Sequence, residues 1–265
     1  MPKRDIAART RAIVRTFNIP ERILYALSKD PIIHFRGEDE SPADHPSNNG
    51  EPLKHLQHEF SDLADLIRGK SVLDYGCGDG YQSAALAQLG ASQVFGVDIN
   101  AARIAFAKSY HHVPNVRYGT EINGQFDVVI SQNAFEHFPR PEEDLQEIFN
   151  ALRPGGKLLL TFGPPWLAPY GSHMHFITKC PWVNILFSEK TVYSVRRLYR
   201  EDGASSYNGI NKMTIKRFER IVTNSEFKMS RLRYVSVKKL PLVKRIPLLR
   251  EMLIVVVTCV LEKPS

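Results

Sequence analysis

Cysteine and long apolar runs are the scarcest features of this 265-residue chain. Its three cysteines, Cys77, Cys180 and Cys259, are odd in number and far apart, which excludes a zinc site built on paired cysteines. No apolar stretch approaches the roughly 20 residues that a membrane-spanning helix needs. Lys3 and Arg4 have no apolar segment behind them, which argues against a secretory signal. We therefore expect a reducing, cytoplasmic location, with a peripheral association at a membrane left open.

Acidic residues are scarce in the last third of the chain. Residues 1–162 carry 17 lysines and arginines and 21 acids, whereas residues 163–265 carry 18 and 7. This asymmetry indicates an acidic partner on the C-terminal side, for which RNA, a phosphorylated substrate and a membrane surface all qualify. The alternative is that the cationic side chains only solvate this part of the chain.

Residues 72–80 carry the most informative motif, Val-Leu-Asp-Tyr-Gly-Cys-Gly-Asp-Gly. The apolar start predicts a buried strand with Asp74 at its carboxyl end. Gly76, Gly78 and Gly80 predict a tight turn whose backbone can approach a ligand, followed by a helix over residues 81–89. Because the free N–H groups of a helix start face the turn, the pattern indicates a nucleotide-type cofactor site at the carboxyl edge of an open α/β sheet.

The glycine spacing separates this motif from the dinucleotide fingerprint. The fingerprint is G-x-G-x-x-G and holds a pyrophosphate, whereas the chain has G-x-G-x-G with an acid two residues before the first glycine. That carboxylate would repel a pyrophosphate and suits a ligand with an ammonium group. S-adenosylmethionine has an ammonium group, a sulfonium and a ribose but no phosphate.

The following segments have the order of a βαβ unit. Residues 94–99 form a second apolar run that ends near Asp98, 18 residues after Gly80, and an acid at this place can accept hydrogen bonds from a ribose. Residues 126–130 and 157–162 read as further buried strands. Between them, residues 151–156 read as the end of a helix with a proline-glycine stop.

These motifs together resemble the class I S-adenosylmethionine-dependent methyltransferases, of the type 11 and ubiquinone-pathway O-methyltransferase kind, over residues 69–162. The resemblance rests on VLDYGCGDG, VFGVDIN, FDVVISQNAFEHF and LRPGGKLLLTF in that order. It implies a Rossmann-like, doubly wound, seven-stranded α/β sheet with an antiparallel edge strand. It also implies S-adenosylmethionine as cofactor and S-adenosylhomocysteine as product.

The resemblance places cofactor contacts on specific residues. Asp74, Gly76 and Gly78 would lie along the methionine, Asp98 would hold the ribose, and Ile99 would pack on the adenine. Thr120 stands where the family often has an acid, so Glu121 or a backbone group would substitute. The complete set of cofactor-binding candidates is Asp74, Tyr75, Gly76, Gly78, Gly80, Asp98, Ile99, Thr120, Glu121, Ser131 and Asn133.

The rest of the chain predicts decorations on one sheet domain. We expect a helical segment over residues 1–68 that covers the site, with a polar loop at 37–50, and a methyltransferase domain over residues 69–265. Residues 163–211 are too long for a simple connection and predict a substrate-side insertion. A helix over 214–225 and edge strands over 228–237 and 252–261 complete the domain. Residues 240–249 read as a packed loop or as a contact with a membrane or an apolar substrate.

Candidate catalytic residues follow the expected fourth strand. His137 is a candidate base because histidine titrates near neutral pH, and His173 and His175 are further candidates. Asn133, Glu136 and His137 form N-x-x-E-H, which is similar to the E-x-x-E-H of metal-binding ubiquinone-pathway and small-RNA methyltransferases. The resemblance therefore implies a possible divalent metal on Glu136, His137, His173 and His175, with Asn133 replacing the first acid.

The acceptor is the least defined part of the prediction. The aromatic residues Trp166 and Tyr170 of the insertion suit stacking on a ring or sugar, so we expect O-methylation of a small-molecule, glycan or lipid-linked hydroxyl. The basic last third and N-x-x-E-H favour an RNA 2′-O-methyltransferase as the alternative, although no RNA-binding module is recognisable and nucleic acid is the weaker partner. A second alternative is a silent S-adenosylmethionine-binding partner subunit. The oligomeric state is left open.

Overall fold

The structure is a computed structural model that describes residues 3–35, 51–240, 243 and 245–265. The chain divides into two compact units. The sheet unit contains Pro42–Gly163, Lys216–Val235 and Val256–Ser265, and the helical unit contains Met1–Ser41, Pro164–Ile215 and Ser236–Val255. The predicted domain boundary at residue 68 stays a prediction.

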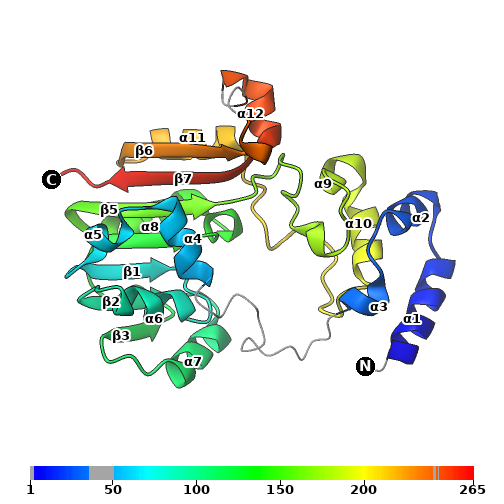
Figure 1. Cartoon of the computed structure of the whole chain (residues 1–265), viewed down its shortest axis with the longest axis horizontal. Helices are drawn as coiled ribbons and strands as arrows, with labels where there is room; N and C mark the ends of the chain where they lie inside the picture. Colours follow the sequence, from blue (N-terminus) through cyan, green and yellow to red (C-terminus); the bar gives the residue numbers. More distant parts are fainter. Residues whose placement is uncertain (1–2, 36–50, 241–242, 244) are drawn as a thin grey trace. The chain divides into compact units, whose positions relative to one another are not determined.

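The sheet unit contains a seven-stranded sheet in the order β3-β2-β1-β4-β5-β7-β6. Figure 1 labels all of these strands except β4. Strands β1 to β5 are parallel, and β7 runs antiparallel to β5. The strands are β1 (Ser71–Tyr75), β2 (Gln93–Val97), β3 (Val116–Gly119), β4 (Phe126–Gln132), β5 (Leu152–Phe162), β6 (Lys228–Ser236) and β7 (Ile254–Glu262). The order reverses at β1, so the carboxyl ends of β1, β2 and β4 meet at the switch point where open α/β sheets bind ligands. The predicted fold class is confirmed.

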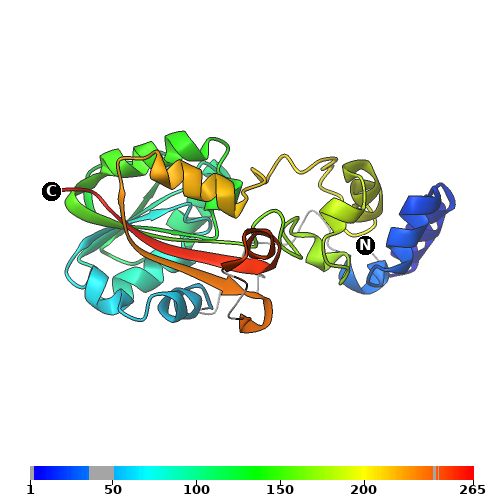
Figure 2. The ribbon, with the colours of Figure 1, turned by 90° about the horizontal axis from the view of Figure 1, so that it is seen from above.

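Helices cover both faces of the sheet, as Figure 2 shows. On one face, Leu56, Phe60 and Leu86 pack with Val72 and Ile130 in a fully buried core. On the other face, α8 and α11 lie over the strands. The helices with most of their residues in this unit are α4 (Glu51–Glu59), α5 (Leu63–Ile67), α6 (Tyr81–Gln88), α7 (Ala101–Tyr110), η3 (Phe135–His137), α8 (Pro141–Ala151) and α11 (Ile215–Thr223).

A cluster of three aromatic rings fixes the position of η3 on the sheet. The ring of Phe135 lies 5.8 Å from that of Phe162 and 6.0 Å from that of Phe218, measured between centroids. All three side chains are fully buried. This packing holds the segment after β4 against the carboxyl end of β5.

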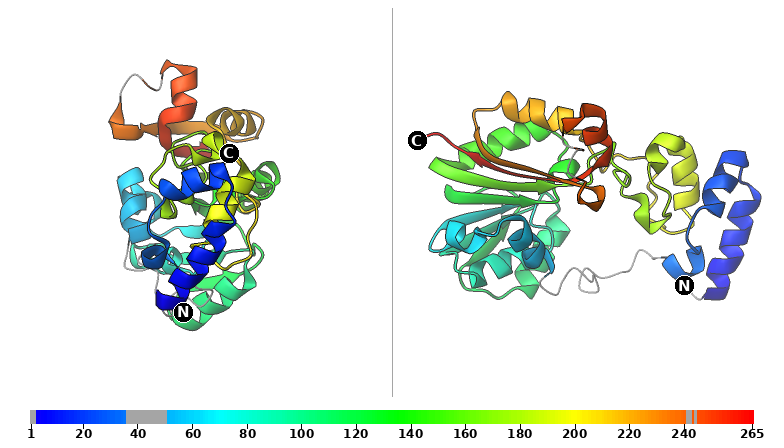
Figure 3. Two further views of the ribbon diagram at one scale, coloured as in Figure 1. Left: turned by 90° about the vertical axis from the view of Figure 1, so that its right-hand side faces the viewer. Right: turned by 45° about the horizontal axis from the view of Figure 1, so that its top comes forward.

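The helical unit joins the N-terminal helices to the insertion. Its elements are α1 (Lys3–Arg15), α2 (Ile19–Ala26), α3 (Pro31–His34), η4 (Met174–Phe176), α9 (Val183–Leu186), α10 (Glu189–Arg196), η5 (Val237–Lys239) and α12 (Pro247–Leu253). Helix α2 contacts α10, as Figure 3 shows, and Leu24 packs with Val192 and Tyr199 in a core of its own. The Tyr199 hydroxyl donates to the Lys29 carbonyl at 2.6 Å. The helical unit therefore has an independent core.

Two predicted boundaries differ from the structure. Helix α8 ends at Ala151, and residues 152–156 belong to β5 because Leu152 already pairs with Phe126. Met252 is helical and not part of the last strand, since Pro247 starts α12 and β7 begins only at Ile254. The insertion folds into three short helices. The polar loop at 37–50 lies outside the described residues.

The described helices are short. None of them is both long enough and apolar enough to cross a lipid bilayer.

Candidate cofactor and catalytic site

The turn after β1 requires glycine at two of its positions. Gly76 and Gly80 both have φ of 80°, in the left-handed region. A Cβ on Gly76 would lie 2.7 Å from the Cβ of Ala134, and one on Gly80 would lie 2.7 Å from the Tyr118 ring. Any side chain at these positions would therefore be strained and would also collide with its surroundings.

The same turn is bound to the end of β2. The amides of Gly76 and Cys77 both donate to the Val97 carbonyl, at 2.8 and 2.9 Å. The amide of Gly78 donates to Oδ2 of Asp98 at 2.9 Å. These three bonds set the loop conformation at the switch point before any ligand arrives.

Asp98 and Ile99 lie just beyond the end of β2. Oδ1 of Asp98 accepts a hydrogen bond from the Asn100 amide at 2.8 Å, so the turn fixes this half-buried carboxylate from both sides. The Ile99 side chain is 82% exposed, which is unusual for isoleucine. A fixed acceptor beside an exposed apolar side chain suits a ribose with an attached base. The ribose and adenine roles stay predictions.

Asp74 is held inside the unit. Its carboxylate is 1% exposed and accepts from Nε2 of Gln82 at 2.7 Å and from Oγ of Ser83 at 2.6 Å. Burial raises the pKa of Asp74 to about 6, and the negative charge of Asp98 acts in the same direction. The structure thus shows Asp74 fixing the first turn of α6. Its predicted attraction for an ammonium group stays a prediction.

Tyr75 points its side chain toward α8. Its hydroxyl donates to Asp144 at 3.0 Å or Glu147 at 2.8 Å, and its ring packs on the edge of Phe138. Burial and the two carboxylates raise the pKa of Tyr75 far above its usual range. Since α8 engages the side chain, we expect any contact of Tyr75 with a cofactor to come from its main chain.

The remaining predicted cofactor residues follow β3 and β4. Thr120 and Glu121 are exposed beyond the end of β3. Ser131 is fully buried, and its hydroxyl has no partner within the described part of the chain. Asn133 is exposed with φ of 51°, and its amide donates to the Thr161 carbonyl at 2.9 Å. The left-handed turn at Asn133 redirects the chain from β4 into η3.

Glu136 is a buried acid on η3. Its side chain is 2% exposed, and Oε1 accepts from the Gly163 amide at 3.2 Å. Oε2 is buried and has no protein partner among the described residues. Burial raises the pKa of Glu136, and the charge of His137 and the Gly163 amide offset this only in part.

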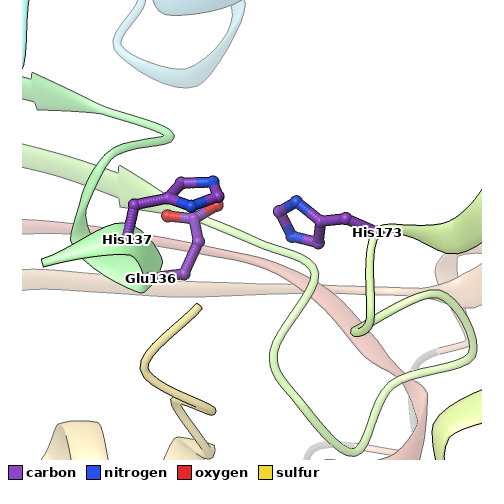
Figure 4. Close-up of side chains that lie close together, drawn as sticks. All are labelled: Glu136, His137 and His173. Carbon is purple, nitrogen blue, oxygen red and sulfur yellow. The ribbon is translucent and has the colours of Figure 1, made fainter. Parts of the chain in front are cut away.

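His137 is the exposed neighbour of Glu136. A ring nitrogen of His137 and a carboxylate oxygen of Glu136 lie within 4.8 Å of each other. Figure 4 draws both side chains, together with His173 of the helical unit. The structure therefore brings an imidazole and a buried carboxyl together after β4.

His173 and His175 belong to the helical unit. His173 precedes η4, with φ of 58°, and is half-buried. His175 is exposed, and partial burial of its ring together with the charge of Lys29 lowers its pKa. Catalytic roles for these two histidines stay predictions.

The residues of the N-x-x-E-H motif fit a divalent cation only in part. Oε1 of Glu136 already accepts from the Gly163 amide, so only Oε2 of this buried carboxyl is left for a cation. Asn133 offers an amide oxygen in place of the first acid. A metal on Glu136, His137, His173 and His175 stays a prediction.

Several positions that shape the site were missed by sequence reasoning. Gln82 and Ser83 hold Asp74, and the Gly163 amide holds Glu136. Polar residues in the first turn after a glycine loop were a usable signal for Gln82 and Ser83. Gly163 had no such signal, because its contact depends on how β5 ends beside η3.

Comparison with known proteins agrees with this geometry. Residues 48–229 match the model of a family described as a methyltransferase domain. The chain is 36% identical over 119 residues to the ubiquinone biosynthesis O-methyltransferase of Pseudomonas paraeruginosa, covering 41% of this chain and 51% of the relative. The chain spans about half the length of the curated relatives it matches.

Solved structures share the fold at low sequence identity. An S-adenosylmethionine-dependent methyltransferase from Mesorhizobium loti superposes with a TM-score of 0.50 at 14% identity, covering 77% of this chain and 97% of that one. The cyclase SpnF superposes with a TM-score of 0.52 at 15% identity, covering 88% and 87%. Likeness at such identities shows the fold alone, and a cyclase is among the proteins that share it.

The family model covers more than half of the chain, and the strand order and the turn after β1 agree with it. The protein therefore belongs to the methyltransferase domain family and has the Rossmann-like class I methyltransferase fold.

Proposed function

We propose that the chain binds S-adenosylmethionine at the carboxyl ends of β1 and β2 and methylates a hydroxyl oxygen. The acceptor would be a small molecule, a glycan or a lipid-linked compound. One observation supports the donor site most directly. The Gly78 and Asn100 amides fix the Asp98 carboxylate beside the exposed Ile99. A preset acceptor beside an apolar surface supports recognition of a nucleoside.

The charges around this site support a cationic donor. Asp74 and Asp98 lie close enough for the charge of Asp98 to raise the pKa of Asp74. Two neighbouring carboxylates disfavour a phosphate and favour a ligand with ammonium and sulfonium groups. S-adenosylmethionine supplies a methyl group that its sulfonium already activates for transfer.

The catalytic step needs alignment of the acceptor and removal of one proton. In our proposal His137 takes the proton of the acceptor hydroxyl as the new carbon–oxygen bond forms and the carbon–sulfur bond breaks. Glu136 lies beside His137 and would position the imidazole and stabilise its charged form. The Phe135 packing keeps both residues on the segment after β4.

Methylation of oxygen has separate support. The curated relatives that the chain matches are named ubiquinone biosynthesis O-methyltransferases, which supports oxygen as the methylated atom. The aromatic residues Trp166 and Tyr170 of the helical unit suit an acceptor with a ring or sugar.

The test is transfer of radiolabelled methyl from the donor to a panel of acceptors. The panel contains phenols, sugars, a lipid-linked alcohol and an RNA oligonucleotide, and each is assayed with wild type and His137→Ala. We expect label on an oxygen of a non-nucleic-acid acceptor, with transfer reduced in His137→Ala while binding of S-adenosylhomocysteine is kept.

Other outcomes would replace this proposal. Label on the 2′-oxygen of RNA would identify an RNA methyltransferase, and label on nitrogen would refute methylation of oxygen. Cofactor binding without transfer to any acceptor would identify a silent partner subunit.

A further inference from the structure

The helical unit contains a hollow of about 560 Å³ that is lined mainly by charged and hydroxyl-bearing residues. The lining comes from α1, from both ends of α10 with Arg197 just after it, and from residues 200–205. Both helices are labelled in Figure 1. The volume lies in the range of small-molecule sites, about 300 to 1,000 Å³. None of the predicted cofactor or catalytic residues lines it.

Cationic side chains outnumber acids in the lining. Arg9, Lys190, Arg197 and Arg200 face the hollow, together with two acids. Arg196, which is not part of the lining, binds both carboxylate oxygens of Asp202, at 2.5 and 2.6 Å.

The second acid is also paired. Glu201 accepts from Nε of Arg9 at 3.0 Å. With both acids neutralised by an arginine, the lining keeps an excess of positive charge. An anion entering the hollow would therefore meet a net positive charge.

Hydrogen-bond donors are also available at the hollow. Nη1 of Arg9 is buried and has no acceptor among the described residues, while Nη2 donates to the Arg197 carbonyl at 2.8 Å. Ser194 and Ser205 add hydroxyl groups to the lining, and Lys190 is exposed. Guanidinium groups and hydroxyls in this combination match the oxygens of a phosphate.

Packing fixes two of the cations in place. The Arg197 guanidinium lies 5.7 Å from the centroid of the Phe17 ring and donates from Nε to the Ser194 carbonyl at 3.1 Å. The Arg200 guanidinium lies 4.9 Å from the centroid of the Phe176 ring. Because these groups are preoriented, less conformational entropy is lost when an anion binds.

We propose that this hollow binds the phosphate group of a small ligand, a phosphomonoester or a pyrophosphate. The charge of the whole unit agrees, because its three stretches carry 19 lysines and arginines against 10 acids. A hollow of defined volume favours a discrete group over a nucleic-acid backbone, which would need an extended basic track. The phosphate comes either from a soluble compound or from a lipid headgroup.

The test is calorimetric titration of inorganic pyrophosphate into the full chain at low ionic strength. The double variant Lys190→Ala/Arg197→Gln removes two lining cations, and Arg200→Gln serves as a second variant if the first unfolds. We expect the double variant to weaken binding by about tenfold or more, since hydrogen bonds to charged groups are the stronger ones. Added salt should weaken binding by the wild-type chain.

The control removes the same charge elsewhere in the helical unit. Arg15→Gln/Lys179→Ala changes two exposed cations outside the hollow and should bind pyrophosphate within about twofold of wild type, because the Debye length limits distant charges. Equal losses in both double variants would overturn the proposal, as would no binding of pyrophosphate by the wild-type chain. Neither result depends on methyl transfer.

A vesicle assay separates the two sources of phosphate. Vesicles of phosphatidylcholine with and without phosphatidic acid are sedimented with the chain. Binding that requires phosphatidic acid, is competed by pyrophosphate and is lost in Lys190→Ala/Arg197→Gln would identify a lipid headgroup. Pyrophosphate binding without vesicle binding would identify a soluble ligand. Vesicle binding that pyrophosphate does not compete would contradict the proposed site.

Discussion

The two units of this chain differ in charge as much as in architecture. The sheet unit carries 16 lysines and arginines against 18 acids, a net charge of −2, and the helical unit carries 19 against 10, a net charge of +9. The sheet unit places Asp74 and Asp98 at its switch point, whereas the helical unit places arginines around a hollow. The difference indicates two ligand chemistries in one chain, a cationic methyl donor and an anionic group.

The units also differ in how their cores are assembled. The sheet core comes mainly from the continuous stretch 51–162, in which strands and helices alternate. The core of the helical unit joins Phe17 and Leu24 to residues 174–207, which are distant in sequence. Local sequence motifs are therefore enough to predict the sheet unit, whereas the helical unit is defined only by contacts between segments that are distant in sequence.

Replacing His137 should have the largest effect on kcat. It should also show which of the two units supplies the catalytic base. His137→Ala should lower kcat by about 10² to 10³, because a general base contributes in this range. His175→Ala in the helical unit should change kcat by less than about threefold. Steady-state kinetics with the identified acceptor checks both, and a larger loss in His175→Ala would move the base to the helical unit.

Two glycine substitutions compare how much free energy of unfolding each unit loses when a side chain is added at a left-handed position. Gly80→Ala should destabilise the sheet unit by about 3 kcal/mol, because φ of 80° is strained for alanine and the new methyl group would overlap Tyr118 and Ala107. Gly203→Ala has a similar φ of 68° but meets no atom within 4 Å, so it should cost the helical unit only about 1 kcal/mol.

Urea unfolding with two probes distinguishes these effects. Both tryptophans, Trp166 and Trp182, lie in the helical unit, so their fluorescence reports on that unit, while circular dichroism reports on both. Equal losses for Gly80→Ala and Gly203→Ala would show that the close contacts around Gly80 do not contribute.

A buried carboxylate, Glu59, gives the sheet unit a defined pH dependence. Burial raises the pKa of Glu59, but bonds from Thr258 and His58 and the charge of Arg233 outweigh it, so the pKa lies below its usual range. The stabilisation is therefore present above the unfolded-state pKa of about 4.5 and is lost as pH falls through the lower folded-state value.

Glu59→Gln should remove this contribution. We expect a loss of about 2 kcal/mol at pH 7 that shrinks as pH falls below about 4.5 and disappears below the lower folded-state pKa of Glu59. Urea unfolding followed by circular dichroism at several pH values checks this. The control Asp65→Asn changes an exposed acid on α5 and should have little effect. A loss for Glu59→Gln that is independent of pH would contradict the assigned cause.

The smallest expected effect is at Ile99. Ile99→Ser should weaken binding of S-adenosylhomocysteine by about fivefold to tenfold, through lost apolar contact with the adenine. Stability should be unchanged, since the side chain is 82% exposed. Ile33→Ser, at a 71% exposed isoleucine of the helical unit, is the matched control and should leave binding unchanged. Equal affinity of Ile99→Ser and wild type would refute the adenine contact.

The sheet could be predicted because its information is local. Glycine spacing, strand-terminal acids and alternating elements place Gly76 to Gly80, Asp98 and the β4 segment at one edge, and the structure shows this arrangement. The ends of elements were less predictable. Residues 152–156 contain proline and glycine, which indicate a helix stop, yet pairing of Leu152 with Phe126 starts β5 there.

Side-chain orientations and contacts between distant segments could not be predicted from the sequence. Tyr75 follows Asp74 in the motif, but its side chain is engaged by α8. The buried environment of Glu136 depends on the Gly163 amide and on three phenylalanine rings from separate segments. The hollow of the helical unit joins α1 to α10, more than 170 residues apart, so charge counting indicated an acidic partner without locating its site.

Calorimetric titration of S-adenosylhomocysteine into wild type, Asp98→Ala and Lys190→Ala/Arg197→Gln tests the assignment of the donor site to the sheet unit most directly. We predict one site per chain in wild type, a loss of about a hundredfold in affinity in Asp98→Ala, and unchanged affinity in the double variant. Thermal unfolding confirms that each variant is folded. Unchanged affinity in a folded Asp98→Ala, or no binding by the wild-type chain, would contradict the donor site described for β1 and β2.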